Sequence, residues 1–307
     1  MSRNSELQQQ LRETSEAEIA AGLREHQLVV DRIKAGMERR RRRGLAATAP
    51  QLDFLAIGDS WFYYPLDDYG WPSAFNSAIV GPRQLRSMGT PPPLINSIAM
   101  YGQAMTAIMG LKNQETMKSL LENANGWLNQ STGLPDAILV SGGGDDIAGD
   151  QFILYLDSKG GLGLDLARFQ GALDSVAASY NALFDFRDEF APTVPIFGHC
   201  YDYALPNGHG ALWAGPWLRP SLDFAGDNYA DDLLIVSDAI DRFHNMLSVL
   251  AATPTNLFTL VDSRGTLSRD TSPPLGWANE LHPYFAGFHA VSKKFLAGLQ
   301  AYFPGRI

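Results

Sequence analysis

The sequence lacks several features that would each have assigned it to a class of protein. Its 307 residues contain one cysteine, Cys200, which excludes an internal disulfide and a zinc site built from thiolates. It has no run of 18 or more apolar residues, so no membrane-spanning segment is expected. The first twenty residues are polar and carry no apolar stretch of the signal-peptide kind, which makes a cytoplasmic location the expectation.

Positive charge is also scarce. The 24 Lys and Arg residues are outnumbered by 33 Asp and Glu residues, and the net charge of −9 argues against nucleic acid as the main partner. The motifs G-x-S-x-G, G-x-x-x-x-G-K-[ST] and H-E-x-x-H do not occur, so the usual nucleophile elbow, the phosphate-binding loop and the helical zinc site are absent. No cofactor and no resident metal is therefore expected.

Apolar runs that alternate with amphipathic stretches predict the fold class. Five strands are expected in the segments LDFLAIG, PLINSIA, DAILVSGGG, VPIFGHCYDY and NLFTLVDSRG. Helices are expected at 103–121, 165–189, 230–250 and 284–302. This order predicts an α/β domain over residues 51–307, with a mainly parallel five-stranded sheet covered by helices on both faces.

The first fifty residues differ from the rest. Residues 5–43 predict one long helix, so residues 1–50 form an N-terminal helical appendage that is a candidate surface for oligomerisation. The helix ends in five arginines, Arg39 to Arg43. This run is either an arm that attracts anions or a solvated helix end where cations suit the helix dipole, and the second interpretation is favoured.

Polar residues follow most of the predicted strands and mark the expected site. Ligands of parallel α/β sheets bind outside the carboxyl ends of the strands. Ser60 follows the first strand in Gly58-Asp59-Ser60, and His282 lies near the chain end in NELHP. A serine early and a histidine late suit a hydrolase whose base comes from the last loop. Residues 204–229, which are rich in Gly, Pro and Trp, are expected to form a long loop that serves as a lid or a pocket wall.

Four short blocks in chain order resemble the SGNH (GDSL-type) hydrolase superfamily over residues 53–300. The blocks are GDS at 58–60, NSIAMYGQAMT at 96–106, GGGDD at 142–146 and NELHP at 279–283. The resemblance implies a flavodoxin-like three-layer αβα sandwich and ester hydrolysis through an acyl-enzyme. It further implies Ser60 as the nucleophile, His282 as the base, and the N–H groups of Ser60 and Gly102 as oxyanion donors.

Two positions depart from the family pattern. Asp145 stands where the third block has an asparagine, and an ionised carboxylate there would oppose an oxyanion, so Asp145 is either protonated or serves another purpose. Asn279 stands where the last block has the aspartate that orients the histidine. Glu280 and Asp262 are candidate substitutes for that carboxylate, and Asp262 is preferred.

Two other function classes stay open. Asp59, Asp145, Asp146 and His282 could converge into an oxygen-rich site for Mg²⁺, Mn²⁺ or Ca²⁺, which would make the protein a metal-dependent hydrolase. Alternatively, the chain could be a non-catalytic binding module that keeps the same fold.

Aromatic residues cluster directly after the predicted nucleophile. The segment WFYYP, beginning at Trp61, is expected to start the wall of an apolar cleft. Other aromatic residues are expected to add to it, about half of them only covering the sheet: Tyr69, Trp71, Trp213, Trp217 and Trp277. His199, at a strand end, is expected to line the pocket. The first substrate to consider is a small-molecule or lipid ester with an acyl chain or an aromatic group, and sugar O-acetyl esters come second.

Overall fold

A single parallel sheet forms the centre of the protein. The computed structural model describes residues 3–45, 51–73, 75–157, 163–212, 214–226 and 228–307. Its five strands are β1 (Asp53–Gly58), β2 (Leu94–Ser97), β3 (Ala137–Ser141), β4 (Ile196–His199) and β5 (Phe258–Val261). They are arranged in the order β2-β1-β3-β4-β5, and all four pairings are parallel. All five predicted strands are confirmed, and the central strands β1, β3 and β4 are buried along their whole length.

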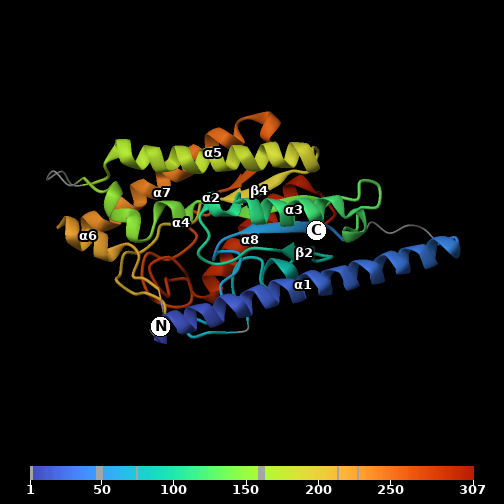
Figure 1. Ribbon diagram of the computed structural model, residues 1–307, viewed down its shortest axis with the longest axis horizontal. Coiled ribbons are helices and arrows are strands. Elements are labelled where there is room, and N and C mark those ends of the chain that lie inside the picture. Colours follow the sequence, from blue (N-terminus) through green and yellow to red (C-terminus); the bar gives the residue numbers. More distant parts are fainter. Residues whose placement is uncertain (1–2, 46–50, 74, 158–162, 213, 227) are drawn as a thin grey trace.

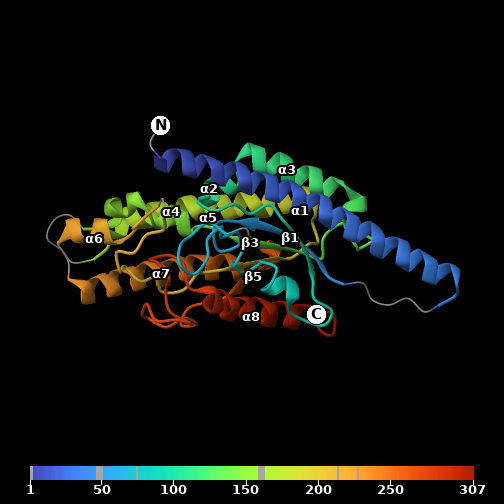
Figure 2. The same ribbon diagram turned by 90° about the horizontal axis from the view of Figure 1, so that it is seen from below.

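Helices cover both faces of the sheet (Figures 1 and 2). Phe258 contacts the aromatic side chains of α5 (Leu166–Phe190), and α3 (Leu111–Glu122) and α7 (Tyr229–Ala251) pack beside α5. Phe197 contacts the end of α8 (Phe285–Tyr302). Because Ile196 pairs with Phe258 and neighbouring side chains on a strand point to opposite faces, Phe197 and Phe258 lie on opposite faces. The predicted three-layer arrangement is therefore confirmed.

The long helix α1 (Arg3–Arg42) lies along the edge strand β2 (Figure 1). Its Leu11 and Val30 side chains are buried, and the His26 Nε2 atom lies 3.2 Å from Asp53 Oδ1. The arginines near its end are exposed, and Arg41 and Arg42 pair with Glu38 on the same helix. These pairs agree with a solvated helix end. The predicted boundary at residue 50 falls within residues 46–50, which lie outside the described residues.

Two predicted segments differ in detail from the structure. The helix expected at 103–121 is divided into α2 (Met105–Ile108) and α3, because the chain turns at Met109 and Gly110. The segment 204–229, expected to be a loop, contains the short helix α6 (Arg219–Ala225), which begins with a proline in its first turn and ends at Gly226 in the left-handed region.

The remaining helical segments are single turns or little more: η1 (Leu85–Ser87), η2 (Ala124–Gly126), α4 (Gly144–Ile147), η3 (Asp150–Tyr155) and η4 (Pro254–Asn256). Among the described helices, none is long and apolar enough to cross a membrane.

Candidate active site

Ser60 is placed at the sheet edge by a tight turn directly after β1. Gly58 ends the strand at φ +153°, and a side chain there would collide with the Ser141 carbonyl oxygen of β3. The Asp59 carbonyl oxygen then accepts hydrogen bonds from the N–H groups of Phe62 (3.1 Å) and Tyr63 (3.0 Å), which closes the turn. Ser60 therefore lies at the tip of the turn, with 9% of its surface exposed.

The C-terminal loop brings His282 to Ser60. The His282 Nε2 atom lies 2.7 Å from Ser60 Oγ, although the two residues are 222 positions apart. The turn that carries His282 is closed by its own carbonyl oxygen, which accepts hydrogen bonds from the N–H groups of Ala278 (3.0 Å) and Asn279 (3.2 Å). The predicted serine and histidine are thus within the distance that a nucleophile–base pair requires.

The Asn279 side chain contacts the second ring nitrogen of His282. Its Oδ1 atom lies 3.0 Å from His282 Nδ1 and also accepts hydrogen bonds from the N–H groups of Leu281 (3.0 Å) and His282 (2.9 Å). Its Nδ2 group donates to the Tyr64 hydroxyl at 2.8 Å. These partners fix the amide with its oxygen toward the ring, so Nδ1 carries the proton and Nε2 is the free acceptor that faces Ser60.

Aromatic rings enclose the histidine. The Tyr64 ring stacks on His282 with centroids 4.2 Å apart, and Trp217 meets it edge-on at 5.8 Å. This burial lowers the pKa of His282 to about 3, because a charged imidazolium would lose its hydration there. His282 is therefore a neutral acceptor throughout the physiological pH range.

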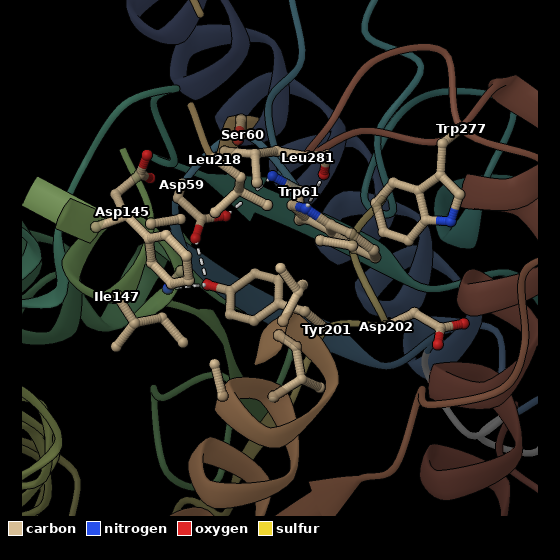
Figure 3. A pocket seen from close by; sticks show the side chains of 17 residues that line it. Asp59, Ser60, Trp61, Asp145, Ile147, Tyr201, Asp202, Leu218, Trp277 and Leu281 are labelled. Carbon is tan, nitrogen blue, oxygen red and sulfur yellow. Dashed lines mark hydrogen bonds between the residues drawn. The ribbon is translucent and has the colours of Figure 1, made fainter. Parts of the chain in front are cut away.

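Two pockets meet at Ser60. The first, here called the inner pocket, holds about 60 Å³ and is lined mainly by apolar side chains, among them Trp61, Ile147, Phe152, Leu218, Ile240 and Trp277. Figure 3 shows Ser60 at the top of this pocket, with Trp61 and Trp277 on one side and Tyr201 below.

The second pocket, here called the outer pocket, holds about 200 Å³ and has a more polar lining, which includes Gln8, Arg12, Tyr64, Gly102, Trp217 and His282. Ser60, Asp145 and Leu281 line both pockets. Gly102 adopts φ +70°, which suits glycine at the turn that brings its backbone into this pocket.

Two carboxyl groups, those of Asp59 and Asp145, line the inner pocket together with Ser60. Asp59 Oδ1 accepts hydrogen bonds from the Trp61 N–H (2.9 Å) and the Ser141 hydroxyl (2.6 Å), and Oδ2 accepts one from the Tyr201 hydroxyl. Burial raises the pKa of Asp59 to about 6. Burial, together with the charges of Asp59 and Asp146, raises the pKa of Asp145 well above its ordinary value of 3.8. Asp145 lies at the junction of the pockets, where burial and these charges oppose its ionisation.

His199 lines neither of the two pockets described at Ser60, contrary to expectation. Its side chain is fully buried behind Asp59, its Nε2 atom lies 2.8 Å from Ser141 Oγ, and its ring stacks on Phe62. The chain continues from His199 through Tyr201, which adopts φ +61° and places its hydroxyl between Asp59 and the Gly144 N–H (3.0 Å). His199 belongs to the supporting layer under the site and does not face a substrate.

The two carboxylates expected to orient His282 lie elsewhere. Asp262 hydrogen bonds with Arg264, whose positive charge and hydrogen bonds lower the pKa of Asp262, and it also lies 3.5 Å from His244. Glu280 is fully buried and accepts hydrogen bonds from four N–H groups of the segment 204–229, those of Gly208, Trp217, Leu218 and Arg219. Asn279, and neither of these carboxylates, contacts His282.

The side chains considered for a metal site are not arranged as one. Among the described residues, no group of three or more His, Cys, Asp or Glu side chains is placed to hold a metal ion. Both Asp59 oxygens are occupied by N–H and O–H donors, and Asp146 accepts a 2.6 Å hydrogen bond from the Met105 N–H.

The aromatic residues predicted to form a cleft lie in three places: in the pocket walls, in the core and on the surface. Trp61 and Trp277 line the inner pocket, and Tyr64 and Trp217 line the outer one. Phe62 packs in the core and Tyr63 donates a hydrogen bond to Glu18 of α1. Tyr69 and Trp71 are 87% and 60% exposed, and Trp213 lies outside the described residues.

Sequence reasoning missed the residues that support the site from other elements. Tyr64 was identified only as part of the cleft wall, and its contact with Asn279 has no local motif. Ser141 and Tyr201 act through Asp59, and Gln8 and Arg12 reach the outer pocket from α1. Tyr201, in GHCYDY after a strand, and Ser141, at the end of DAILVS, had a sequence signal, because polar and aromatic residues at strand ends gather at the ligand edge.

Comparison with known proteins supports the fold. No family model matches the sequence, and no curated protein matches it either. The solved structure of a lipase, Lip_vut3 from a goat rumen metagenome, matches with a TM-score of 0.53 and 17% identity over 81% of this chain and 97% of that one. An extracellular lipase from Streptomyces rimosus (TM-score 0.48, 18% identity, 81% and 99% covered) and a protein from Slackia heliotrinireducens assigned as an SGNH hydrolase (0.48, 13%, 81% and 100%) are also similar. The chain therefore has the α/β fold of a known lipase, as the resemblance to the SGNH hydrolases predicts.

Proposed function

We propose that this protein is a serine ester hydrolase that cleaves carboxylic esters through an acyl-enzyme on Ser60. One observation carries the proposal: Ser60, His282 and Asn279 form a continuous hydrogen-bonded row with its nucleophile at the junction of two pockets. The fold of a known lipase supports the same conclusion.

The proton path follows from the hydrogen bonds of His282. As Ser60 Oγ forms a bond to the ester carbonyl carbon, its proton passes to the His282 Nε2 atom, 2.7 Å away. The tetrahedral intermediate then loses the alcohol, which takes the proton back from Nε2. In the second half, Nε2 accepts a proton from water while the water oxygen attacks the acyl carbon. Nε2 then returns this proton to Ser60 Oγ as the acyl–oxygen bond breaks and the carboxylic acid leaves.

Asn279 performs one of the two tasks of an orienting carboxylate. Its oxygen holds the proton on Nδ1, which is the tautomer that catalysis needs, because the Tyr64 contact and two N–H donors prevent the amide from turning over. It supplies no negative charge to stabilise the imidazolium. A pKa of about 3 makes His282 a weak base toward the Ser60 proton. The enzyme is therefore expected to act best on esters whose leaving groups are readily expelled.

The oxyanion is stabilised by the N–H groups of Ser60 and Gly102 and by the acid form of Asp145. A carboxylic acid kept neutral by its surroundings can donate a hydrogen bond to a developing anion. Asp145 lines both pockets at Ser60, and its raised pKa favours the form that carries the proton. This arrangement replaces the amide donor of the family's third block.

The two pockets divide the substrate. The apolar inner pocket accepts the acyl part, and its small volume of about 60 Å³ favours a short acyl chain. The larger outer pocket, on the side of His282, accepts the alcohol part, which must receive its proton from that residue.

Active-site labelling combined with turnover tests the proposal. A fluorophosphonate should label the protein stoichiometrically at Ser60, and the purified protein should hydrolyse p-nitrophenyl butyrate. Ser60→Ala should abolish both, whereas Ser141→Ala, at a buried serine with its own histidine partner, should keep both. An activity that survives in Ser60→Ala, or one that is lost with a chelator in a protein that takes no label, would overturn the proposal and favour a metal-dependent hydrolase.

A further inference from the structure

The N-terminal helix forms part of the outer pocket. Gln8 and Arg12 of α1 line this pocket together with Ser60 and His282. Because they are four positions apart, their side chains lie one above the other on the same helix face. A helix that precedes the sheet domain in the sequence therefore contributes directly to the surroundings of the nucleophile.

Contacts on both sides of Arg12 hold that part of α1 in place. Leu11 and Ser15 are buried, and Glu18 accepts a hydrogen bond from the Tyr63 hydroxyl, three residues after the nucleophile. Further along the helix, His26 lies 3.2 Å from Asp53 at the start of β1. The position of Arg12 over the pocket is thus set by buried contacts and does not depend on its own side chain.

Arg12 is the only Lys or Arg among the described side chains that line the outer pocket. Within the described part of the chain, no carboxylate lies within ion-pair distance of the Arg12 guanidinium, whose other neighbours include the Tyr101 phenol. His282 is neutral, and burial favours the uncharged form of Asp145. Burial raises the pKa of Tyr101, the residue before Gly102, and the nearby Arg12 charge opposes that rise. Arg12 is not among the charges that shift the pKa of Asp145.

We propose that Arg12 binds an anionic group, a carboxylate or a phosphate, on the alcohol part of the ester. The proposal rests on the function proposed above, since the alcohol part lies in the outer pocket. A guanidinium presents a fixed fork of N–H donors that matches either oxyanion with two hydrogen bonds. With Gln8 beside it as a neutral amide donor, α1 selects esters whose leaving alcohol carries negative charge away from the reacting bond.

Three acetate esters of one phenol series test this assignment. 4-Acetoxybenzoate carries a carboxylate, 4-acetoxyphenyl phosphate carries a phosphate, and 4-acetoxybenzamide is the neutral counterpart. The quantity to measure is the ratio of kcat/KM for each anionic ester to kcat/KM for the neutral ester. In Arg12→Gln at least one of the two ratios should fall about tenfold, which corresponds to about 1.4 kcal/mol, with the change mainly in KM because the group is remote from the reacting bond.

Two further variants separate charge recognition from helix docking. Arg12→Lys keeps the charge without the fork and should retain part of the preference. Arg24→Gln removes an exposed arginine three turns along the same helix and should leave both ratios unchanged. The preference of the unaltered protein should also weaken as the salt concentration rises, since Arg12 is exposed.

The ratios decide the outcome. If Arg12→Gln changes neither ratio, because all three esters lose activity together or because none does, Arg12 does not recognise an anion and the inference is overturned. A fall for the carboxylate only or the phosphate only supports it and identifies the group. A failure of the proposed function would be recognised by a different result. Hydrolysis of the neutral ester would then persist in Ser60→Ala.

Discussion

In the described part of the chain, two serine–histidine pairs of nearly equal length lie at the same edge of the sheet. Ser60 Oγ lies 2.7 Å from His282 Nε2, and Ser141 Oγ lies 2.8 Å from His199 Nε2. The first pair borders both pockets, whereas the second is buried beneath Asp59. Distance alone does not tell which serine is a nucleophile.

The partners of the second ring nitrogen distinguish the two pairs. Asn279 Oδ1 accepts the proton of His282 Nδ1, so Nε2 can take a proton from Ser60. In the other pair, His199 Nδ1 accepts a hydrogen bond from the Tyr201 N–H at 3.2 Å, so the ring proton is on Nε2 and is donated to Ser141. Ser141 in turn donates to Asp59. One pair is arranged for proton transfer, and the other is a fully satisfied structural network.

The largest expected effect concerns the first pair. His282→Ala and Ser60→Ala should each lower kcat for p-nitrophenyl butyrate by about 10⁴ or more, and the double variant should be no slower than either, because the two residues act as one unit. Ser141→Ala should stay within about tenfold of the unaltered protein, since its hydroxyl is already committed to Asp59. Steady-state kinetics on the four variants checks this, and a double variant far slower than both single variants would contradict it.

The second prediction concerns a variant that places a negatively charged carboxylate beside His282. Asn279→Asp should raise the pKa of His282 above about 3, because a carboxylate stabilises the imidazolium. It should also raise kcat roughly tenfold or more, since the amide already fixes the tautomer and only the charge is gained. The measurement is kcat against pH: the acid limb should move to higher pH as the plateau rises.

An unchanged acid limb in Asn279→Asp would mean that the new carboxylate does not interact with His282. Asn279→Ala serves as the matched control, because it removes both the oxygen and the contact with Tyr64. Its activity should fall below that of the unaltered protein, as the tautomer is no longer held.

The sequence carried enough information for the sheet, most helices and the central row of the site. Apolar runs with small residues at their ends predicted β1 to β5 because buried parallel strands are apolar on both faces. Ser60, His282 and Asn279 follow from motif order, since each sits at a strand end or in the closing loop.

The orienting group was not predictable in the same way. Asp262 is the preferred candidate from the sequence because it is a carboxylate at a strand end. In the structure it accepts hydrogen bonds from the backbone N–H and the side chain of Arg264, two residues later. The roles of Tyr64, Ser141 and Arg12 depend on contacts between elements far apart in the chain, which no local pattern specifies.

A third prediction concerns the stability of the second pair. Ser141→Ala removes the acceptor of the His199 Nε2–H group and one donor to Asp59 in a fully buried position. A buried group left without its partner costs about 1–3 kcal/mol. Urea unfolding should show a loss of this size without a change in slope. Ser175→Ala, at an exposed serine of α5 whose hydroxyl donates to the Gly171 carbonyl within the helix, should change stability by far less.

The last prediction concerns Asp59 and Asp145, the two carboxyl groups that connect the buried pair with the pair at the pockets. The charge of Asp59, which the buried pair holds in place, helps to raise the pKa of Asp145, which lines both pockets at Ser60. Below that raised pKa, Asp145 is an acid that donates to the oxyanion, and above it a carboxylate opposes the developing charge. We therefore expect kcat to decline on the alkaline side, although His282 itself is neutral above about pH 3.

Asp145→Asn should remove the alkaline decline and leave kcat within a few-fold at neutral pH, because the amide donates a hydrogen bond at every pH. The variant should also be more stable than the unaltered protein above the ordinary carboxyl pKa. A carboxyl group whose pKa is raised by folding lowers the free energy of unfolding as the pH rises toward the raised pKa, and the amide removes this loss. Profiles of kcat from about pH 5 to about pH 10 and unfolding at two pH values measure both effects. Asp150→Asn, at an exposed aspartate after α4, is the control and should keep the decline. A kcat that falls tenfold in Asp145→Asn at neutral pH would contradict the donor role, because it would mean that the negative charge itself contributes to the reaction.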